Sequence, residues 1–529
     1  MRRRSAHRRG LILAAAGGAL ALLAAACGGG GGGGGGAKSA LVIGTTDSQV
    51  TSIDPAGSYD LPSSTLQYNV FQLLLKIPPG GSKPVPDVAQ KCDFTDPKTY
   101  KCTIKSGLKF SNGDPLTSKD VKFSFDRNKK INDPNGAWSI YDASFKSVDA
   151  PDPTTVVFHL TAPDATWPVK LTYAAASIVD SKVYPADKKL TDDTKTVGSG
   201  HYKLTKFQNG QQAVLVANPN YSGSDKPKTS NVIVRYYQKS SALKLAIEQG
   251  DVDVAYRNLA PTEFKSLKTE SSKGVKVVSG NGTEIRYLVF NVKKKPFDNK
   301  YVRQAVAQTI NRDQINNNIY NGDFQSLYSP IPVGLDGHKD VFKDKYGAPD
   351  PAKAKALLAK AGVKAPLPVT LWYTPTHYGP ATADEMNEVK RQLDSSGDFK
   401  VTLKNTEWVQ YQKGYKQDQL YGMYQLGWFP DYPDSDDYLA PFYLKGGFYG
   451  NNYNNPTVNK LISKEEGEIN QAKRLPIFDQ IQKIGAEDVP MLPLWQAKQQ
   501  AAVRDNVEGV TTTFDPAYSF RFWVISKKS

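Results

Sequence analysis

The sequence predicts a mixed α/β protein built as two or three lobes, and two observations carry this prediction. Helix-like and strand-like segments alternate along most of the 529 residues, which is typical of partly parallel sheets covered by helices. About 490 residues remain after the N-terminal export signal and the glycine-rich segment up to residue 40, too many for one small core. No internal repeat of solenoid period is present, so we expect lobes and not a stack of repeats.

The elements of the first half are each predicted from a local signal. Residues 41–45 (LVIGT) form a short apolar run and 154–161 are rich in β-branched side chains, so both are expected as strands. Residues 117–130 begin with the Thr-x-x-Asp spacing of a capping box and continue as an amphipathic helix. An Asn-Gly pair within 201–217 predicts a tight hairpin turn.

In the second half, apolar residues recur at helical spacing in four segments. These predicted helices are 240–249, 299–310, 351–361 and 381–394. Gly250 ends the first of them before the strand-like DVDVAY, because glycine readily adopts the left-handed conformation of a helix C-terminus. A further strand is expected at 367–373, ahead of the last helix.

The N-terminus predicts export. Five arginines precede an uncharged run over residues 11–26, which is short for a membrane span and ends in small residues, so 1–26 are interpreted as a signal peptide. The sequence Ala-Ala-Ala-Cys ending at Cys27 resembles the lipobox of bacterial lipoproteins, with alanine at the usual leucine position. We therefore predict lipidation of Cys27, with simple secretion as the alternative. General and twin-arginine export both stay open.

Nine glycines follow Cys27, and residues 27–40 are expected to be a flexible tether. A glycine-rich chain of this length reaches roughly 15–18 Å on average. This geometry predicts a folded body held at the outer face of the bacterial cytoplasmic membrane.

Charge and cysteine content limit the classes of function. Five of the 15 excess positive charges lie in the signal, and the remaining basic residues are interleaved with acids, so no nucleic-acid partner is expected. Cys92 and Cys102 flank a turn between two strand-like runs and are predicted to form a disulfide in an oxidising compartment. No histidine or third thiol lies near them, so neither a metal site nor a cofactor is predicted.

Seven stretches, in order, resemble the solute-binding proteins of peptide, nickel and related importers powered by ATP-binding-cassette proteins. The stretches are IDPA at 53–56, KFSNGDPLT with DV at 109–121, VGSGHY at 197–202, GDVD at 250–253, PFD to VRQA at 296–305, DPAKA to AG at 350–362, and GW with DYPD at 427–434. The second is very similar to the family's "kFsdGtplTaeDV" signature. The resemblance covers nearly everything from 41 to 525.

This resemblance implies a periplasmic-binding-protein-like fold of two lobes that close about a hinge. The implied parts are lobe I at 41–290 with an extra subdomain at about 76–190, lobe II at 291–498, and a return to lobe I at 499–529. The chain is expected to cross between lobes near Phe290-Asn291 and near Gln496–Ala502. The implied function is capture of a short peptide by a monomer that delivers it to permease and ATPase subunits.

The candidate site centres on GWFPDYPDSDDY at 427–438, which neither a strand nor a helix requires. In related peptide binders an aspartate of this loop pairs with the peptide's α-ammonium group, and the matching residue here is Asp431. A carboxylate in a dry cleft orients such a ligand strongly. Trp428 and Tyr432 are predicted to line the site, and Tyr59 and Asn291 are further candidates facing it.

Four other residues are set aside as parts of the core or the surface. Trp372, Trp408 and Trp495 are expected in the core, and Arg391 is expected as an exposed cation on an amphipathic helix. The motifs around 112–120 and 350–351 are interpreted as turns and helix starts that keep the fold.

Three alternatives are weighed against peptide binding. A secreted hydrolase lacks support because no GxSxG elbow, HExxH motif or P-loop is present, so no catalytic residue and no enzymatic activity are predicted. The same fold holding a metal chelate, haem, an oligosaccharide or an opine-like compound stays open, because fold does not settle the ligand. A surface adhesin or signalling receptor is the third alternative.

Overall fold

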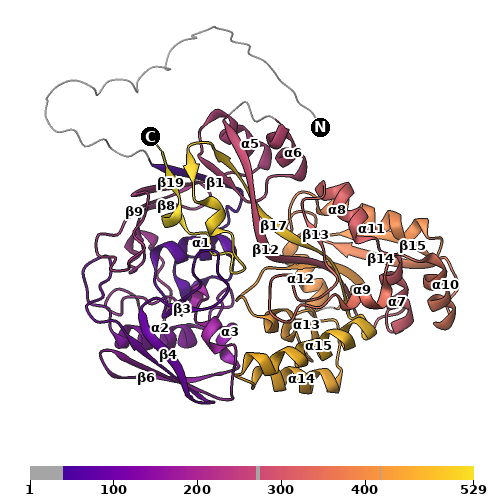
Figure 1. Cartoon of the computed structure of the whole chain (residues 1–529), viewed down its shortest axis with the longest axis horizontal. Coiled ribbons are helices and arrows are strands. Elements are labelled where there is room, and N and C mark those ends of the chain that lie inside the picture. Colours follow the sequence, from indigo (N-terminus) through magenta and orange to yellow (C-terminus); the bar gives the residue numbers. More distant parts are fainter. Residues whose placement is uncertain (1–39, 270–273, 418, 529) are drawn as a thin grey trace, which may run out of the picture. The chain divides into compact units, whose positions relative to one another are not determined.

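The computed structural model describes residues 40–269, 274–417 and 419–528 (Figure 1). The predicted signal peptide, Cys27 and most of the predicted tether lie outside the described residues. Within the described residues, helices and strands alternate as the sequence predicts, and the mixed α/β prediction is confirmed.

An eleven-stranded mixed sheet forms the framework of the described residues. Its order is β15-β14-β16-β12-β17-β11-β1-β10-β9-β8, with β13 beside β17. The strands are β1 Leu41–Thr45, β8 Tyr202–Gln208, β9 Gln212–Ala217, β10 Asn231–Tyr236, β11 Val254–Tyr256, β12 Val275–Phe290, β13 Gln325–Ser326, β14 Leu367–Tyr373, β15 Phe399–Asn405, β16 Met423–Trp428 and β17 Met491–Arg504. Strand β1 is parallel to β10 and β11, and β14 is parallel to β15 and β16.

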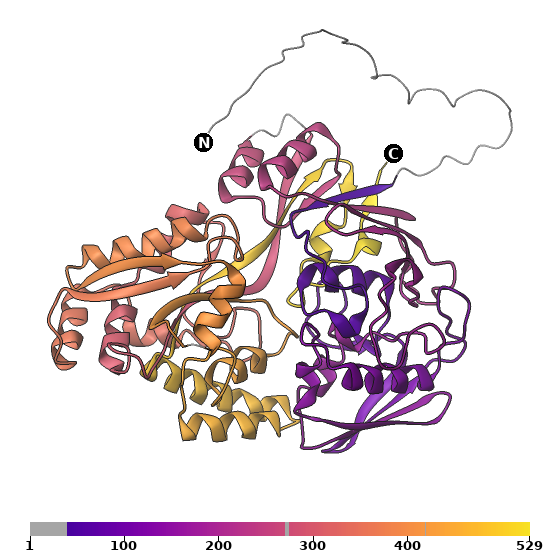
Figure 2. The same cartoon turned by 180° about the vertical axis from the view of Figure 1, so that it is seen from behind.

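Two long antiparallel strands, β12 and β17, connect the two lobes and lie side by side in both views (Figures 1 and 2). In the first lobe β17 pairs with β11, whereas in the second lobe β12 pairs with β16. The β12–β17 register is interrupted between Asn281 and Ile285. The strand that flanks this pair changes across the irregularity, from β11 beside β17 to β16 beside β12. A crossing of the chain between lobes near Phe290-Asn291 stays a prediction.

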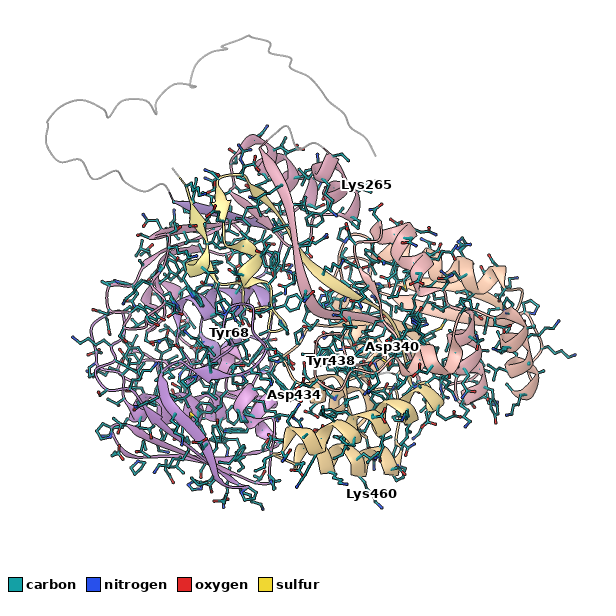
Figure 3. The ribbon with its side chains drawn as sticks, viewed as in Figure 1. Tyr68, Lys265, Asp340, Asp434, Tyr438 and Lys460 are labelled. Carbon is teal, nitrogen blue, oxygen red and sulfur yellow. A yellow bond between two sulfur atoms is a disulfide. The ribbon has the colours of Figure 1, made fainter. Side chains whose placement is uncertain are left out.

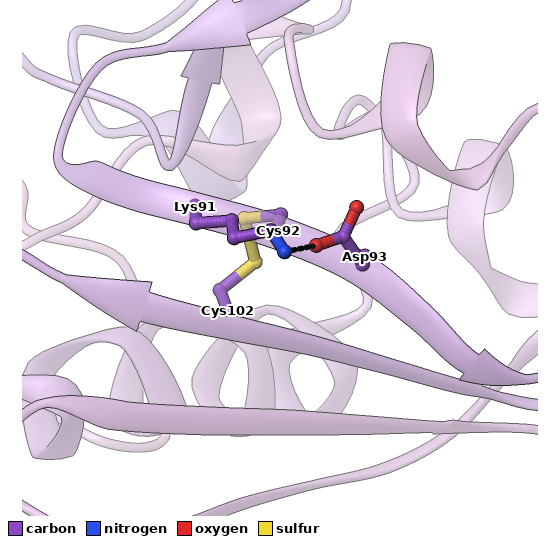
Figure 4. Close-up of a disulfide and its surroundings, with 4 residues drawn as sticks. All are labelled: Lys91, Cys92, Asp93 and Cys102. Carbon is purple, nitrogen blue, oxygen red and sulfur yellow. Dashed lines mark ion pairs between the residues drawn. A yellow bond between two sulfur atoms is a disulfide. The ribbon is translucent and has the colours of Figure 1, made fainter.

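The first lobe carries a smaller sheet with its own hydrophobic core. Its strands, in spatial order, are β4 Ala89–Asp96, β5 Thr99–Ile104, β7 Thr155–Leu160 and β6 Phe145–Asp152. Helix α2, Ser118–Ile131, contacts β6 and β7 and contributes Val121 and Phe125 to this core. Cys92 and Cys102 are register partners across β4 and β5 and form the predicted disulfide (Figure 4).

Helices cover the sheets of both lobes. The remaining helices of the first lobe are α1 Leu61–Val70, α3 Ser139–Asp142, α4 Trp167–Lys170, α5 Ser240–Gln249 and α6 Pro261–Thr269. Those of the second lobe are α7 Lys300–Thr309, α8 Arg312–Tyr320, α9 Val341–Tyr346, α10 Pro351–Lys360, α11 Thr382–Ser395, α12 Trp408–Gln412, α13 Ala440–Tyr443, α14 Pro456–Glu466 and α15 Gln471–Asp488. Short strand pairs complete the fold, β2 Leu75–Lys76 with β3 Val85–Pro86 and β18 Val507–Glu508 with β19 Ser526–Lys527.

Local signals in the sequence explain where the predicted helices begin and end. Thr117 and Asp120 form the expected capping box of α2. The Asp350 side chain caps α10, whose first residue is a proline, and Gly250 ends α5 with a φ of 81°. Among the described residues, none of the helices combines the length and the apolar composition needed to cross a membrane.

Candidate functional site

The segment that follows β16 lies where the second lobe faces the first, as the labelled Asp434 and Tyr438 show in Figure 3. Every residue of β16 is buried, and the strand ends at Trp428. Residues 429–434 leave the sheet, and a short 3₁₀ helix, Ser435–Tyr438, follows. The buried strand therefore fixes the start of a polar loop at the boundary between the lobes.

Two of the four aspartates of this loop bind groups of their own lobe. Both carboxylate oxygens of Asp434 accept hydrogen bonds from the guanidinium of Arg474 at 2.8 Å. Asp436 accepts the hydroxyl proton of Tyr432 at 3.1 Å and is 2 % exposed. These contacts hold the loop together, and both oxygens of Asp434 are occupied by Arg474.

A third aspartate, Asp437, ties the loop back to the end of β16. Its Oδ2 accepts hydrogen bonds from the indole Nε1 of Trp428 at 3.1 Å and from the backbone N–H of Asp431 at 2.9 Å. Burial raises the pKa of the Asp437 carboxyl, and the nearby Asp431 raises it further. Asp437 thus positions the backbone from which the Asp431 side chain extends.

The fourth aspartate, Asp431, extends to the first lobe. The hydroxyl of Tyr59, which lies just before α1, donates a hydrogen bond to Asp431 Oδ2 at 2.6 Å. No cation among the described residues forms an ion pair with this carboxylate. Burial raises the pKa of Asp431 to about 7, and the hydrogen bond from Tyr59 acts against that rise. Tyr59 and Asp431 are thus brought together across the two lobes.

The other predicted site residues lie further from this contact. The ring of Trp428 packs against Phe442 and Phe448 in the core of the second lobe. The ring of Tyr432 is buried and faces the ammonium of Lys170, from the first lobe, at 5.8 Å.

Asn291 is not brought to the Asp431 loop. It follows the end of β12 that pairs with Met423, whereas Trp428 pairs with the opposite end of the same strand segment. Its side-chain oxygen accepts hydrogen bonds from the backbone N–H of Lys293 and from the side chain of Asn452. The structure places Asn291 among these polar groups of the second lobe.

A cavity of about 110 Å³ lies beside β12 and β17, and sequence reasoning did not identify most of its walls. Its lining includes Arg257, Glu284, Arg286, Tyr378 and Trp495. Arg257 follows β11 in the first lobe, and its guanidinium lies 4.7 Å from the ring centre of Phe429 in the Asp431 loop. The cavity therefore adjoins the same loop as the Tyr59–Asp431 contact.

Trp495 and Arg391, which the sequence analysis did not assign to the site, lie in the core and on the surface respectively. Trp495 is 2 % exposed and belongs to the core as predicted, but it also lines the cavity. Arg391 pairs with Glu388 three residues away and is half exposed, as expected for a surface cation. No motif marked Arg257 or Arg286, since an isolated arginine carries no spacing signal. In the described residues no group of His, Cys, Asp and Glu is arranged to hold a metal ion.

Comparison with known proteins identifies the family of the chain. The sequence model of the bacterial extracellular solute-binding proteins, family 5 (middle), matches residues 83–450. The chain is 30 % identical over 505 residues to the probable D,D-dipeptide-binding periplasmic protein of Escherichia coli (strain K12), covering 89 % of this chain and 91 % of the relative. It is 28 % identical to di/tripeptide-binding protein 3 of Pseudomonas aeruginosa (strain UCBPP-PA14), covering 82 % and 85 % of the two chains.

Solved structures show the same fold. A Helicobacter pylori periplasmic binding protein associated with an ABC transporter, in complex with the peptide STSA, superposes with a TM-score of 0.79 at 24 % identity. The superposition covers 93 % of this chain and 98 % of the other. The two-lobed architecture predicted from the sequence is thereby confirmed.

Proposed function

Because the chain belongs to the bacterial extracellular solute-binding proteins of family 5, we propose that it captures short peptides between its lobes for an ATP-binding-cassette importer. The observation that carries this proposal is Asp431, a carboxylate at the boundary between lobes that has no cationic partner among the described residues. The α-ammonium group of a peptide supplies the missing charge. Its hydrogen bonds to a carboxylate are charge-assisted and therefore about twice as strong as neutral ones.

The loop contacts explain how Asp431 is made ready for a ligand. Asp437 holds the Asp431 backbone, so the carboxylate is positioned before a ligand arrives. The Tyr59 hydroxyl satisfies one oxygen of Asp431. A ligand that contacts both lobes stabilises their closed arrangement in proportion to its extra affinity for that state. Recognition by main-chain hydrogen bonds would tolerate many side chains.

The ligand is identified most directly by mass spectrometry of molecules that co-purify with the protein. A thermal-shift screen with di- to hexapeptides then compares the wild type, Asp431→Ala and a control, Asp93→Ala. Asp93 is a suitable control because it is exposed on the disulfide hairpin, far from the loop after β16 in the fold. We expect peptides to stabilise the wild type and the control, and Asp431→Ala much less.

Two results would contradict the proposal in different ways. Equal stabilisation of all three proteins by peptides would remove Asp431 from the site while leaving peptide binding intact. Co-purification of a haem, an oligosaccharide or a metal chelate, with no response to peptides, would assign another solute to the same fold.

We further propose that the protein holds its cargo without transforming it. The site contains carboxylates and aromatic side chains that bind and orient, and the family is one of solute-binding proteins. Incubation of purified protein with the peptides that stabilise it should leave them intact by mass spectrometry. Hydrolysis that persists after further purification would overturn this assignment.

The proposed location is the outer face of the cytoplasmic membrane, with a lipid on Cys27 and the permease and ATPase subunits as partners. The signal and the cysteine motif in residues 1–27 support this location. Cys27→Ser should release the protein from membranes into the soluble extracytoplasmic fraction. Intact-mass measurement of the wild type should show the added lipid, and an unmodified wild-type mass would exclude the anchor.

A further inference from the structure

Helix α6 of the first lobe meets the end of α8 of the second lobe beside the cavity of about 110 Å³ (Figure 1). Pro261 and Phe264 of α6 line the cavity, and so do Asp323 and Phe324, which follow α8. These residues form a second contact between the lobes. It involves no residue of the loop after β16, so it is separate from the Tyr59–Asp431 hydrogen bond.

One face of α6 is directed at the second lobe. Pro261, Phe264 and Lys268 recur at intervals of three and four residues, which places them on the same side of the helix. Phe264 is buried and belongs to the cavity lining, whereas Lys268 does not line the cavity. Helix α6 therefore supplies an apolar wall together with a cation that lies beyond this wall.

The turn after α8 holds Asp323 in a defined position. Asn321 and Gly322 have φ angles of 55° and 77°, the left-handed conformation that commonly ends a helix. The side chain of Asn316 then accepts a hydrogen bond from the backbone N–H of Phe324 at 3.0 Å and donates one to its carbonyl oxygen at 2.6 Å. These bonds fix the turn against α8, so Asp323 does not belong to a free loop.

Aromatic packing supports the same turn from the side of the cavity. The ring of Phe324 stacks on Tyr320, with 4.3 Å between the ring centres, and lies 4.6 Å from the ring centre of Trp495. The carboxylate of Glu385 accepts hydrogen bonds from the Tyr320 hydroxyl at 2.7 Å and from the Trp495 indole at 3.1 Å. The wall beside Asp323 is therefore fixed by stacking and by hydrogen bonds.

An ion pair joins these two elements across the boundary between the lobes. The ammonium of Lys268 lies 2.6 and 2.7 Å from the two carboxylate oxygens of Asp323. The Asn321 amide also donates a hydrogen bond to the Pro261 carbonyl oxygen at 3.4 Å. The side chains of Lys268 and Asp323 are 38 % and 23 % exposed. Because water screens such a pair, it changes an equilibrium at most about fivefold, and a ligand can separate it.

We propose that the Lys268–Asp323 pair is a gate that ends the ligand cavity on this side and makes the protein select short peptides. The inference rests on the proposed peptide-binding function and specifies the length of the peptide. A peptide of two or three residues leaves the gate closed. Each further residue adds about 3.3–3.6 Å of extended chain, so a longer peptide separates Lys268 from Asp323 and loses their interaction.

Isothermal titration calorimetry with alanine peptides, from dialanine to hexaalanine, tests the gate. All members carry the same charged termini and the same side chain, so they differ only in length. We expect the wild type to bind the two- and three-residue peptides at least about fivefold more tightly than the five- and six-residue ones. Lys268→Gln and Asp323→Asn should each lower this ratio by about three- to fivefold.

The ratio of affinities separates the gate from lobe closure. Loss of an ion pair between the lobes also weakens closure, but this effect is the same for every peptide length and cancels in the ratio. Exchange of the two charges, Lys268→Asp with Asp323→Lys, should restore most of the preference for short peptides.

A matched control removes an ion pair that does not cross the lobes. Lys483 pairs with Asp479 at 2.7 Å within α15, and both side chains are partly exposed. Lys483→Gln should leave the length preference at its wild-type value. The wild-type length series needs no variant, so it stands even where a substitution prevents folding.

Three results would overturn the gate. Equal or tighter binding of the longer peptides by the wild type would overturn it and leave the proposed function in place. A preference that persists unchanged in both single variants, shown to be folded by circular dichroism, would assign the length limit to other residues. Failure of every peptide to bind would overturn the proposed function together with this inference.

Discussion

Two aspartates from motifs of this sequence end up in opposite situations. Asp54, in the first lobe, forms a two-pronged ion pair with Arg127 at 2.9 and 2.5 Å and also accepts the backbone N–H of Leu190. Asp431, in the second lobe, accepts a hydrogen bond from the Tyr59 hydroxyl and has no cationic partner among the described residues. Asp54 is buried and Asp431 is partly buried, and among the described residues only Asp54 has a cation that compensates its charge.

The contrast separates an aspartate that serves the fold from one that we propose contacts the ligand. Asp54 is 2 % exposed, and its carboxylate links the segment after β1 to Arg127 in α2 and to the backbone of Leu190. A carboxylate satisfied in this way has no capacity left for a ligand. Burial raises the pKa of Asp431 to about 7, which agrees with the proposal that a cationic ligand group pairs with this carboxylate.

Asp54→Asn should have the largest effect on stability. It leaves the Arg127 guanidinium buried without its counterion, which costs about 3–5 kcal/mol of unfolding free energy. Denaturant titration at pH 7.5 measures the loss. A change below about 1 kcal/mol would show that the Asp54–Arg127 pair is not needed by the fold.

Asp431→Asn is the matched substitution, and we expect it not to lower the stability of the fold. The pKa of Asp431 is raised from 3.8 in the unfolded chain to about 7, so the folded state loses stability as pH rises through that window. The asparagine variant lacks this loss and should be as stable as the wild type at pH 7.5, or slightly more stable. Destabilisation comparable to that of Asp54→Asn would place Asp431 with the structural aspartates.

For ligand affinity, in contrast to stability, substitution of Asp431 should have a larger effect than substitution of Asp54. Asp431→Ala should weaken binding of a peptide with a free N-terminus by about 10- to 100-fold, because it removes a charge-assisted hydrogen bond. Calorimetry with the N-acetylated form of the same peptide is the control, since that form lacks the ammonium. Equal loss for both forms would mean that Asp431 does not read the amine.

The pH dependence of peptide affinity should report the titration of the Asp431 carboxyl. An ammonium ligand favours the Asp431 carboxylate, so binding releases a proton below the pKa of about 7. Affinity should fall about tenfold per pH unit below 7, and fall again above about 8 as the peptide amine loses its proton. Asp431→Asn should remove the acidic limb of this profile and keep the alkaline one. Titration between pH 5 and 9 measures both limbs.

Tyr59→Phe should have the smallest effect. It removes the hydrogen bond that lowers the pKa of Asp431, so the acidic limb should move to higher pH, with an affinity change of about 0.5–1.5 kcal/mol. In an Asp431→Asn background the same substitution should leave the pH profile unchanged. An upward shift that persists without Asp431 would have to arise from another group near Tyr59.

Much of the fold could be predicted because its signals are local. The capping box at Thr117, the glycine after α5 and the proline at the start of α10 each act within a few residues. The Cys92–Cys102 disulfide could also be predicted from the sequence, because one turn brings the two cysteines into register. The interruption of the β12–β17 register between Asn281 and Ile285 could not be predicted, since it depends on the pairing of two strands far apart in the sequence.

The sequence predicted a mixed α/β fold, the approximate bounds of helices such as α2, α5 and α10, and a loop rich in aspartates after β16, whereas the export signal stays a prediction. Tertiary contacts show which of those aspartates has no cationic partner among the described residues, and that two arginines outside any motif line one cavity. The physical reason is distance along the chain. Tyr59 and Asp431 are separated by 372 residues, and their hydrogen bond exists only because the lobes of the folded chain bring them together.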